Sequence, residues 1–70
     1  DTDRLARDID EARSLLDETE GMELVVPYLR TRLSDTLARA EQTPAGSADM
    51  ESIMSTLEDL MNQVRENAGL

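Results

Sequence analysis

The chain has no cysteine and no histidine, and its one aromatic residue is Tyr28. The absence of cysteine excludes both a disulfide framework and a thiolate metal site. Without histidine the chain lacks the commonest general base and metal ligand, and no lysine is present to activate a serine. We therefore predict a protein that is not an enzyme and that has no metal ion, no cofactor and no small-molecule substrate.

Long apolar runs and an excess of positive charge are also missing. The longest apolar run, residues 24–26, is far shorter than the roughly 20 residues that cross a bilayer. With 16 acidic residues against 7 arginines the net charge is −9, which would repel nucleic acid and anionic membranes. The chain shows no secretory leader pattern, so we expect a cytoplasmic protein. Because it starts at Asp1 and not at Met, we expect it to be part of a longer chain.

The chain also has few large apolar side chains with which to form a core. Its 70 residues amount to one domain or less. Ordering them costs about 100 kcal/mol, at roughly 1.5 kcal/mol per residue, and no Phe or Trp is present to offset this cost. A self-sufficient monomer is therefore disfavoured.

Apolar residues recur at helical spacing in three segments, 3–20, 23–41 and 49–69, and no segment alternates like a strand. The sequence therefore predicts an all-α fold, with the first two helices forming an antiparallel hairpin. The apolar positions of the first segment are Leu5, Ile9, Ala12 and Leu16, with Ala6 and Leu15 beside them. Those of the second are Met22, Val26, Leu29, Leu33, Leu37 and Ala40, with Val25 beside them. Those of the third are Met50, Ile53, Leu57, Leu60 and Val64, with Met54 and Met61 beside them.

Glycine and proline set the expected ends of the first two helices. Gly21 follows the first periodic run directly, where a helix commonly ends in a left-handed residue. Pro27 has no N–H and fits only the first turn, so the second helix should begin no earlier than about Glu23.

The last part of the chain predicts a separate helix. Residues 42–48 are small and polar with no apolar repeat, which is typical of a linker. Ser47 or Asp49 can cap the helix that follows, and Gly69 offers its stop, with Leu70 closing back on the last turn. The predicted organisation is a helical hairpin over 1–41, a flexible linker over 42–48 and an amphipathic docking helix over 49–70.

Two arrangements bury the same apolar faces. In one, the hairpins of two chains form an intertwined four-helix bundle, with the third helix tethered outside it. In the other, the third helix folds onto its own hairpin as a monomeric three-helix bundle. Charge favours the dimer, whose interface would contain Leu5, Ile9, Ala12, Leu16, Val26, Leu29, Leu33 and Leu37.

The charges divide unevenly along the chain. Residues 1–20 hold eight acids and three arginines, residues 21–42 hold three of each, and residues 43–70 hold five acids and one arginine. The third helix is therefore acidic with few cations of its own. We expect it to meet a basic partner outside this chain, because complementary charge governs partner choice and encounter rate.

The other polar features of the chain do not predict a chemical role. Adjacent acids such as Asp8, Asp10 and Glu11 point to different sides of a helix, and we expect them to stay solvated. No window has the glycine and glutamate spacing of a calcium loop. We expect Tyr28 to lie at a boundary, with its ring buried and its hydroxyl in water.

Three stretches of the chain have a distinctive residue pattern: Ile9-Asp10-Glu11-Ala12-Arg13-Ser14-Leu15-Leu16, Val26-Pro27-Tyr28-Leu29-Arg30-Thr31-Arg32-Leu33, and residues 49–58. Together they resemble the C-terminal docking domains of modular type I polyketide synthase subunits. The first stretch is similar to that family's first dimerisation helix, and the second stretch to its second. Residues 49–58 look like the docking helix, with Ile53-Met54 at its apolar pair and Leu57-Glu58 at its aliphatic-acid step. Met54 stands where an aromatic is common in the family.

The resemblance implies a non-catalytic connector that dimerises and binds the basic N-terminal coiled coil of a downstream subunit. Such a connector orders the transfer of a growing acyl chain between polypeptides. The residues that it implies enter the partner's groove are Ile53, Met54, Leu57, Leu60 and Met61. The acids that it implies set specificity are Glu51, Glu58 and Asp59.

Two other functions are compatible with the sequence. A small helical chaperone or assembly subunit would pack its three helices against a client helix as one unit. An acidic mimic of nucleic acid would explain the net charge of −9 but not the regular apolar spacing of the third helix. The docking domain accounts for both features.

Overall fold

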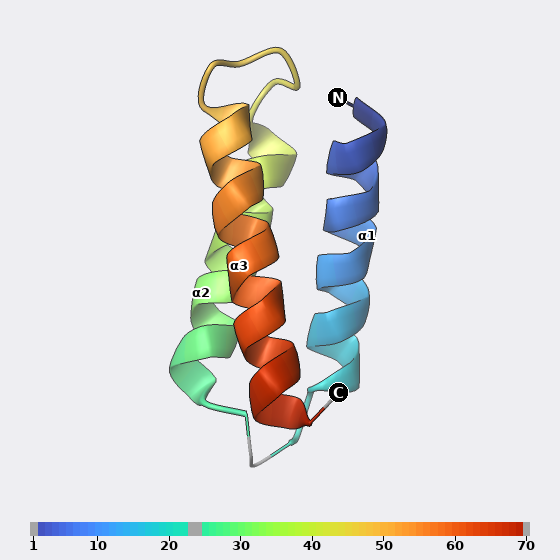
Figure 1. Ribbon diagram of the computed structural model, residues 1–70, viewed down its shortest axis with the longest axis vertical. Coiled ribbons are helices and arrows are strands. Elements are labelled where there is room, and N and C mark those ends of the chain that lie inside the picture. The colour runs from blue at the N-terminus through green and yellow to red at the C-terminus, as the bar shows by residue number, and fades with distance from the viewer. Residues whose placement is uncertain (1, 23–24, 70) are drawn as a thin grey trace.

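The structure is a computed structural model that describes residues 2–22 and 25–69, and this part of the chain holds three helices and no strand. Helix α1 spans Thr2–Glu18, α2 spans Pro27–Gln42 and α3 spans Met50–Ala68. The helices pack side by side, with α2 antiparallel to both others, so that α1 and α3 start at the same end (Figure 1). The prediction of an all-α fold is confirmed.

The first connection is set by Gly21 and Pro27. Helix α1 ends at Glu18, and Gly21 adopts a left-handed φ of +80° in the turn that follows. Helix α2 begins at Pro27, after an extended Val26, which is later than the periodicity predicts. Proline at the first helical position has no N–H to leave unpaired and a φ already suited to a helix. The start expected at Glu23 lies outside the described residues.

The ends of α3 are closed by local hydrogen bonds. The hydroxyl of Ser47 accepts a hydrogen bond from the backbone N–H of Asp49 at 3.2 Å, whereas the Asp49 side chain makes no capping bond. At the other end Gly69 is left-handed, and its N–H donates to the carbonyls of Arg65 and Glu66. Gly69 therefore ends the helix as predicted. The contact expected for Leu70 lies outside the described residues.

The core lies along the line where the three helices meet, and each helix contacts both of the others. Leu33 of α2 and Leu57 and Val64 of α3 have no exposed surface. Helix α3 contributes the longest row of buried side chains, which are Met50, Ile53, Met54, Leu57, Leu60, Met61 and Val64. Within one chain, α3 therefore completes the core that the hairpin lacks.

Helix α1 turns a partly polar row toward this core. Its buried residues are Asp8, Ala12 and Leu15, and buried Thr19 just after the helix continues their heptad spacing of four, three and four. Ala12 and Leu15 belong to the apolar stripe that the sequence predicts, whereas Leu5, Ile9 and Leu16 of that stripe are only partly buried at the edge of the core. Asp8 and Thr19 are polar, so an apolar pattern does not detect them.

The bundle measures 37 × 19 × 16 Å along its principal axes. In the part of the chain that the structure describes, no helix combines the length and the apolar content needed to cross a membrane.

Leu33 provides a test of this core. Leu33→Ala removes a fully buried side chain and should lower the free energy of unfolding by about 3 kcal/mol, because the lost burial and the remaining cavity both count. Leu29→Ala is the control in the same helix, at a partly buried position, and should cost clearly less. Urea denaturation followed by circular dichroism measures both. Equal losses of unfolding free energy in the two variants would contradict a core centred on Leu33.

Candidate functional site

The apolar residues assigned to partner binding are buried within this chain. Leu57 is 0% exposed and packs in a cluster with residues of α1 and α2. The linker folds α3 back onto the hairpin, so α3 does not stand apart from it as expected for a tethered helix. Ile53, Leu60 and Met61 belong to the same cluster, and Met54 is buried as well. In this closed arrangement, the face of α3 assigned to a partner is already occupied by its own hairpin.

The residues assigned to the dimer interface fall into three groups in the same chain. Ala12, Leu33 and Leu37 are buried in the shared core. Leu5, Ile9, Leu16 and Leu29 pack against it and are partly buried. Val26 is 45% exposed. The structure is thus the three-helix arrangement, in which α3 covers much of the face that a second hairpin would cover.

Ion pairs join α1 to α3 along one side of the bundle. Arg4 donates to both carboxylate oxygens of Glu58, at 3.0 and 2.8 Å, and to Glu51 at 3.4 Å. Further along, Arg65 of α3 donates to Glu11 of α1 at 3.3 Å. Asp59, the third acid assigned to specificity, is exposed and makes no ion pair within the described residues.

The spacing of these pairs defines how α1 and α3 align. Arg4–Glu58 and Glu11–Arg65 are each separated by 54 residues, as two parallel helices in constant register require. Arg4 and Glu11 are one heptad apart, and so are Glu51, Glu58 and Arg65. This is the pattern of flanking charges in a parallel coiled coil. We call the contact formed by Arg4, Asp8, Glu11, Glu51, Glu58 and Arg65 the α1–α3 seam.

Asp8 lies inside this seam. It is only 6% exposed, and its Oδ2 atom has no hydrogen-bond partner. Burial, reinforced by the neighbouring Glu58, raises the pKa of Asp8 from 3.8 to about 6. The hydrogen bonds from Arg4 hold the pKa of Glu58 well below its usual range. The expectation that the acids of α1 stay solvated is therefore wrong for Asp8.

A sequence signal for Asp8 existed. Ala12 and Leu15 are three residues apart, and continuing their heptad by four residues in each direction reaches Asp8 and Thr19. Thr19 satisfies its buried hydroxyl locally, by donating to the carbonyl of Leu15 at 2.8 Å. Oδ2 of Asp8, by contrast, receives no hydrogen bond within the described chain. The carboxylate of Glu58 cannot supply one to an ionised Asp8, because its oxygens are also acceptors.

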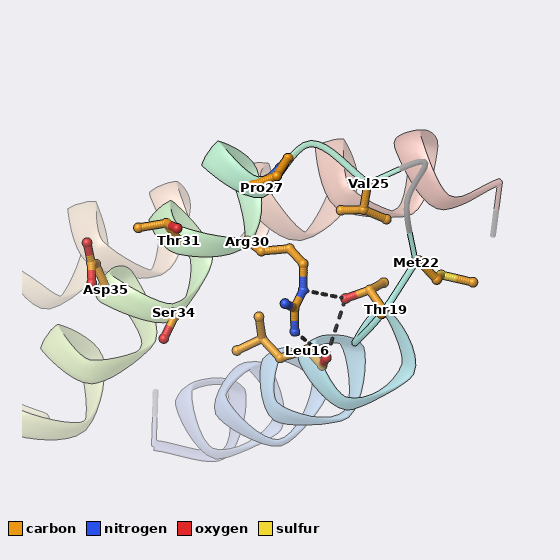
Figure 2. A pocket seen from close by; sticks show the side chains of 10 residues that line it. Leu16, Thr19, Met22, Val25, Pro27, Arg30, Thr31, Ser34 and Asp35 are labelled. Atoms are coloured by element: carbon orange, nitrogen blue, oxygen red, sulfur yellow. Dashed lines mark hydrogen bonds between the residues drawn. The ribbon is translucent and has the colours of Figure 1, made fainter.

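A second polar contact fixes the hairpin at its turn. The guanidinium of Arg30 reaches from α2 to the end of α1, as Figure 2 shows, and donates to the Leu16 carbonyl at 2.9 Å and to the Thr19 hydroxyl at 3.2 Å. It thereby satisfies a carbonyl of the last helical turn. Beside Arg30 lies an open groove of about 460 Å³ bordered by Met22 and Pro27.

Apolar side chains are exposed at this same end of the molecule. Met22, Val26 and Tyr28 are all exposed, and Tyr28 reaches 65%. The expectation of a buried Tyr28 ring is therefore wrong, because the residue lies in the first turn of α2 on the side away from the core. The guanidinium carbon of Arg32 lies 6.0 Å from the centre of the ring.

The described residues place the apolar face of α3 against the hairpin, with ion pairs to α1 beside it. Among the described residues, no group of three or more His, Cys, Asp or Glu side chains is placed to hold a metal ion. Comparisons with protein-family models, with curated proteins and with solved structures give no match.

Exchanging the charges of one pair tests the parallel register. Glu11→Arg places a cation beside Arg65 and should lower the free energy of unfolding by up to about 1 kcal/mol, the range of exposed ion pairs. Adding Arg65→Glu should restore the stability, since the pair is then reversed. Asp10→Arg, at an exposed neighbouring position, controls for the change in net charge. Urea titrations that show no recovery in the double variant would contradict the register.

Proposed function

We propose that the chain is a non-catalytic docking domain of a multienzyme assembly line, as its resemblance to polyketide synthase docking domains implies. Residues 1–41 would pair with a second copy as an intertwined four-helix bundle, and α3 would bind the basic N-terminal coiled coil of the next subunit. The observation that carries the proposal is the α1–α3 seam. There, α3 binds a parallel helix through an apolar row and two carboxylates that receive hydrogen bonds from one arginine.

The seam indicates which helices α3 accepts. Glu51 and Glu58 are one heptad apart on the flank of the buried row, and both pair with Arg4. A foreign helix with arginines at heptad spacing could give each carboxylate a cation of its own. Charge-assisted pairs of this kind select partners, and like charges reject the wrong ones.

Helix α1 is a weak competitor for α3. Of the buried residues of α1, Asp8 is a carboxylic acid and Ala12 is small, so α1 offers α3 fewer apolar atoms than a row of large aliphatic residues would. Each buried CH₂ contributes about 0.8 kcal/mol. A partner helix with larger aliphatic residues at the equivalent positions would bury more apolar surface and bury no carboxylate. Such a partner would therefore compete with α1 for this side of α3.

Dimerisation and release of α3 are coupled in this proposal. Leu33 and Leu37 of the hairpin are covered by α3 in the closed chain and by the second hairpin in the dimer. The same side chains cannot be covered by both at once. Each dimer would thus present two α3 helices, and binding of the first raises the effective concentration of the second.

Leu57→Asp tests this coupling on the full chain. The change puts a carboxylate into the core of the closed bundle and should remove α3 from it, at a cost of about 3 to 5 kcal/mol. The hairpin needs no Leu57 to pair with a second hairpin. Sedimentation equilibrium should therefore show a larger dimer fraction for Leu57→Asp than for the unmodified chain.

Ser55→Asp is the matched control, since it adds the same charge to the exposed side of α3 and should leave the sedimentation unchanged. An unfolded monomer for Leu57→Asp would contradict the dimer and would favour the single bundle as the functional unit.

A designed probe tests the binding mode of α3. The probe is a synthetic two-stranded parallel coiled coil with arginine at its e and g positions, and its control carries glutamate there. Arg4→Glu removes the competing cation from α1, so it should strengthen binding of the arginine probe about tenfold at 50 mM salt. Isothermal calorimetry over a salt series measures the effect.

Arg7→Glu makes the same change of charge on α1 at an exposed residue without an ion pair in the described chain, and should have a smaller effect. Equal binding of the arginine and glutamate probes would contradict the role of Glu51 and Glu58.

One observation favours a second function, a small helical chaperone or assembly subunit. The three helices form one closed unit that exposes Met22, Val26 and Tyr28 at one end. A client helix would bind there without opening the bundle. In that case Arg4→Glu would leave client binding unchanged, and Tyr28→Ala would weaken it.

A further inference from the structure

The surroundings of Asp8 differ from those of the other acids of α1. Its carboxyl group borders a groove of about 450 Å³ between α1 and α3. No residue of α2 borders this groove within the described chain. The other charged side chains that face it are Arg4, Arg7 and Glu11 of α1, and Glu58 and Arg65 of α3.

These neighbours do not supply a donor to Oδ2 of Asp8. Arg4 donates to Glu58 and Glu51, and Arg65 donates to Glu11. Oδ2 of Asp8 is consequently buried without a partner. A buried carboxylate oxygen that receives no hydrogen bond disfavours the ionised form, so the site favours a proton on Asp8. A protonated Asp8 can donate a hydrogen bond to the Glu58 carboxylate, which Arg4 holds in its ionised form.

We propose that Asp8 makes the α1–α3 seam depend on a single proton, and thereby governs the release of α3. With the proton shared between Asp8 and Glu58, α1 holds α3 in the closed bundle. When the proton is lost, two adjacent carboxylates face each other in the seam, and α3 passes more readily to a partner helix. This role in release rests on the docking function proposed above, whereas the proton dependence of the bundle does not.

The direction of the pH effect on stability follows from the pKa shifts of Asp8 and Glu58. The raised pKa of Asp8, about 6 against an ordinary 3.8, means that the folded chain binds this proton more tightly than the unfolded chain. The resulting stability is present in acid and is lost as the pH rises through about 6. The lowered pKa of Glu58 has the opposite effect, so its contribution is lost as the pH falls toward strongly acidic values. The closed bundle is therefore more stable at pH 5 than at pH 7.5.

Urea denaturation of the full chain measures this dependence. The ratio of folded to unfolded protein should be about tenfold higher at pH 5 than at pH 7.5, as the shift of the Asp8 pKa requires. Asp8→Asn, which cannot ionise, should abolish most of this difference and raise the ratio at pH 7.5. Asp10→Asn changes an exposed acid of the same helix and should retain the difference.

Two further measurements do not depend on how Asp8→Asn folds. The carboxyl ¹³C resonance of Asp8 in the unmodified chain should titrate with a midpoint near 6. Asp8→Leu, which fills the same buried position with an apolar side chain, should also remove the pH dependence. A midpoint near 4 for Asp8, or an unchanged pH dependence in Asp8→Leu, overturns the proposal.

Binding of the arginine coiled-coil probe separates this proposal from the docking function. The unmodified chain should bind the probe several-fold more tightly at pH 7.5 than at pH 5.5, and Asp8→Asn should bind it equally at both. Equal binding by the unmodified chain at both pH values overturns the control of release by Asp8. Failure of the probe to bind at either pH overturns the docking function, while the carboxyl titration still decides the proton dependence.

Discussion

Burial of the apolar face of α3 against the α1–α2 hairpin is the interaction on which the rest of this structure depends. More than half of the buried apolar side chains in the described part of the chain belong to α3, and none of them is aromatic. A two-helix hairpin without Phe or Trp buries too little surface to offset the entropy of ordering it. Its open face must be covered either by α3 or by another chain, and this choice links stability to association.

The contact between α1 and α3 has an apolar inner part and a polar outer edge. Its ion pairs fix a parallel register, while Oδ2 of Asp8 is buried in the same contact without a hydrogen-bond partner. Residues 43–49 connect α3 to α2, with which α3 shares the most extensive helix contact in the bundle. We infer that the α1–α3 contact, the less extensive of the two contacts of α3, combines a defined alignment with limited strength.

Much of the fold can be predicted from the sequence. The three helices follow from apolar spacing, and Gly69 and Pro27 act at the helix ends through backbone properties that depend on residue type alone. The burial of Asp8 does not follow, because hydrophobic patterns exclude a polar residue even when it continues a heptad through Ala12 and Leu15. Nor does the position of α3, since a second hairpin and α3 would bury the same residues of α2. The candidate site was predicted as a set of residues on α3, but its contact with Arg4 requires the tertiary structure.

The distance between α1 and α3 in solution tests the exchange of α3 most directly. The chain has no cysteine, so Ser14→Cys with Ser55→Cys places one spin label on the exposed side of each helix. Pulsed electron paramagnetic resonance on labelled chain diluted with unlabelled chain then reports the distance within one molecule. We expect one short distance for the dilute chain and a second, longer distance that grows as the arginine coiled coil is added. A single short distance that persists at saturating probe would contradict the exchange of α3.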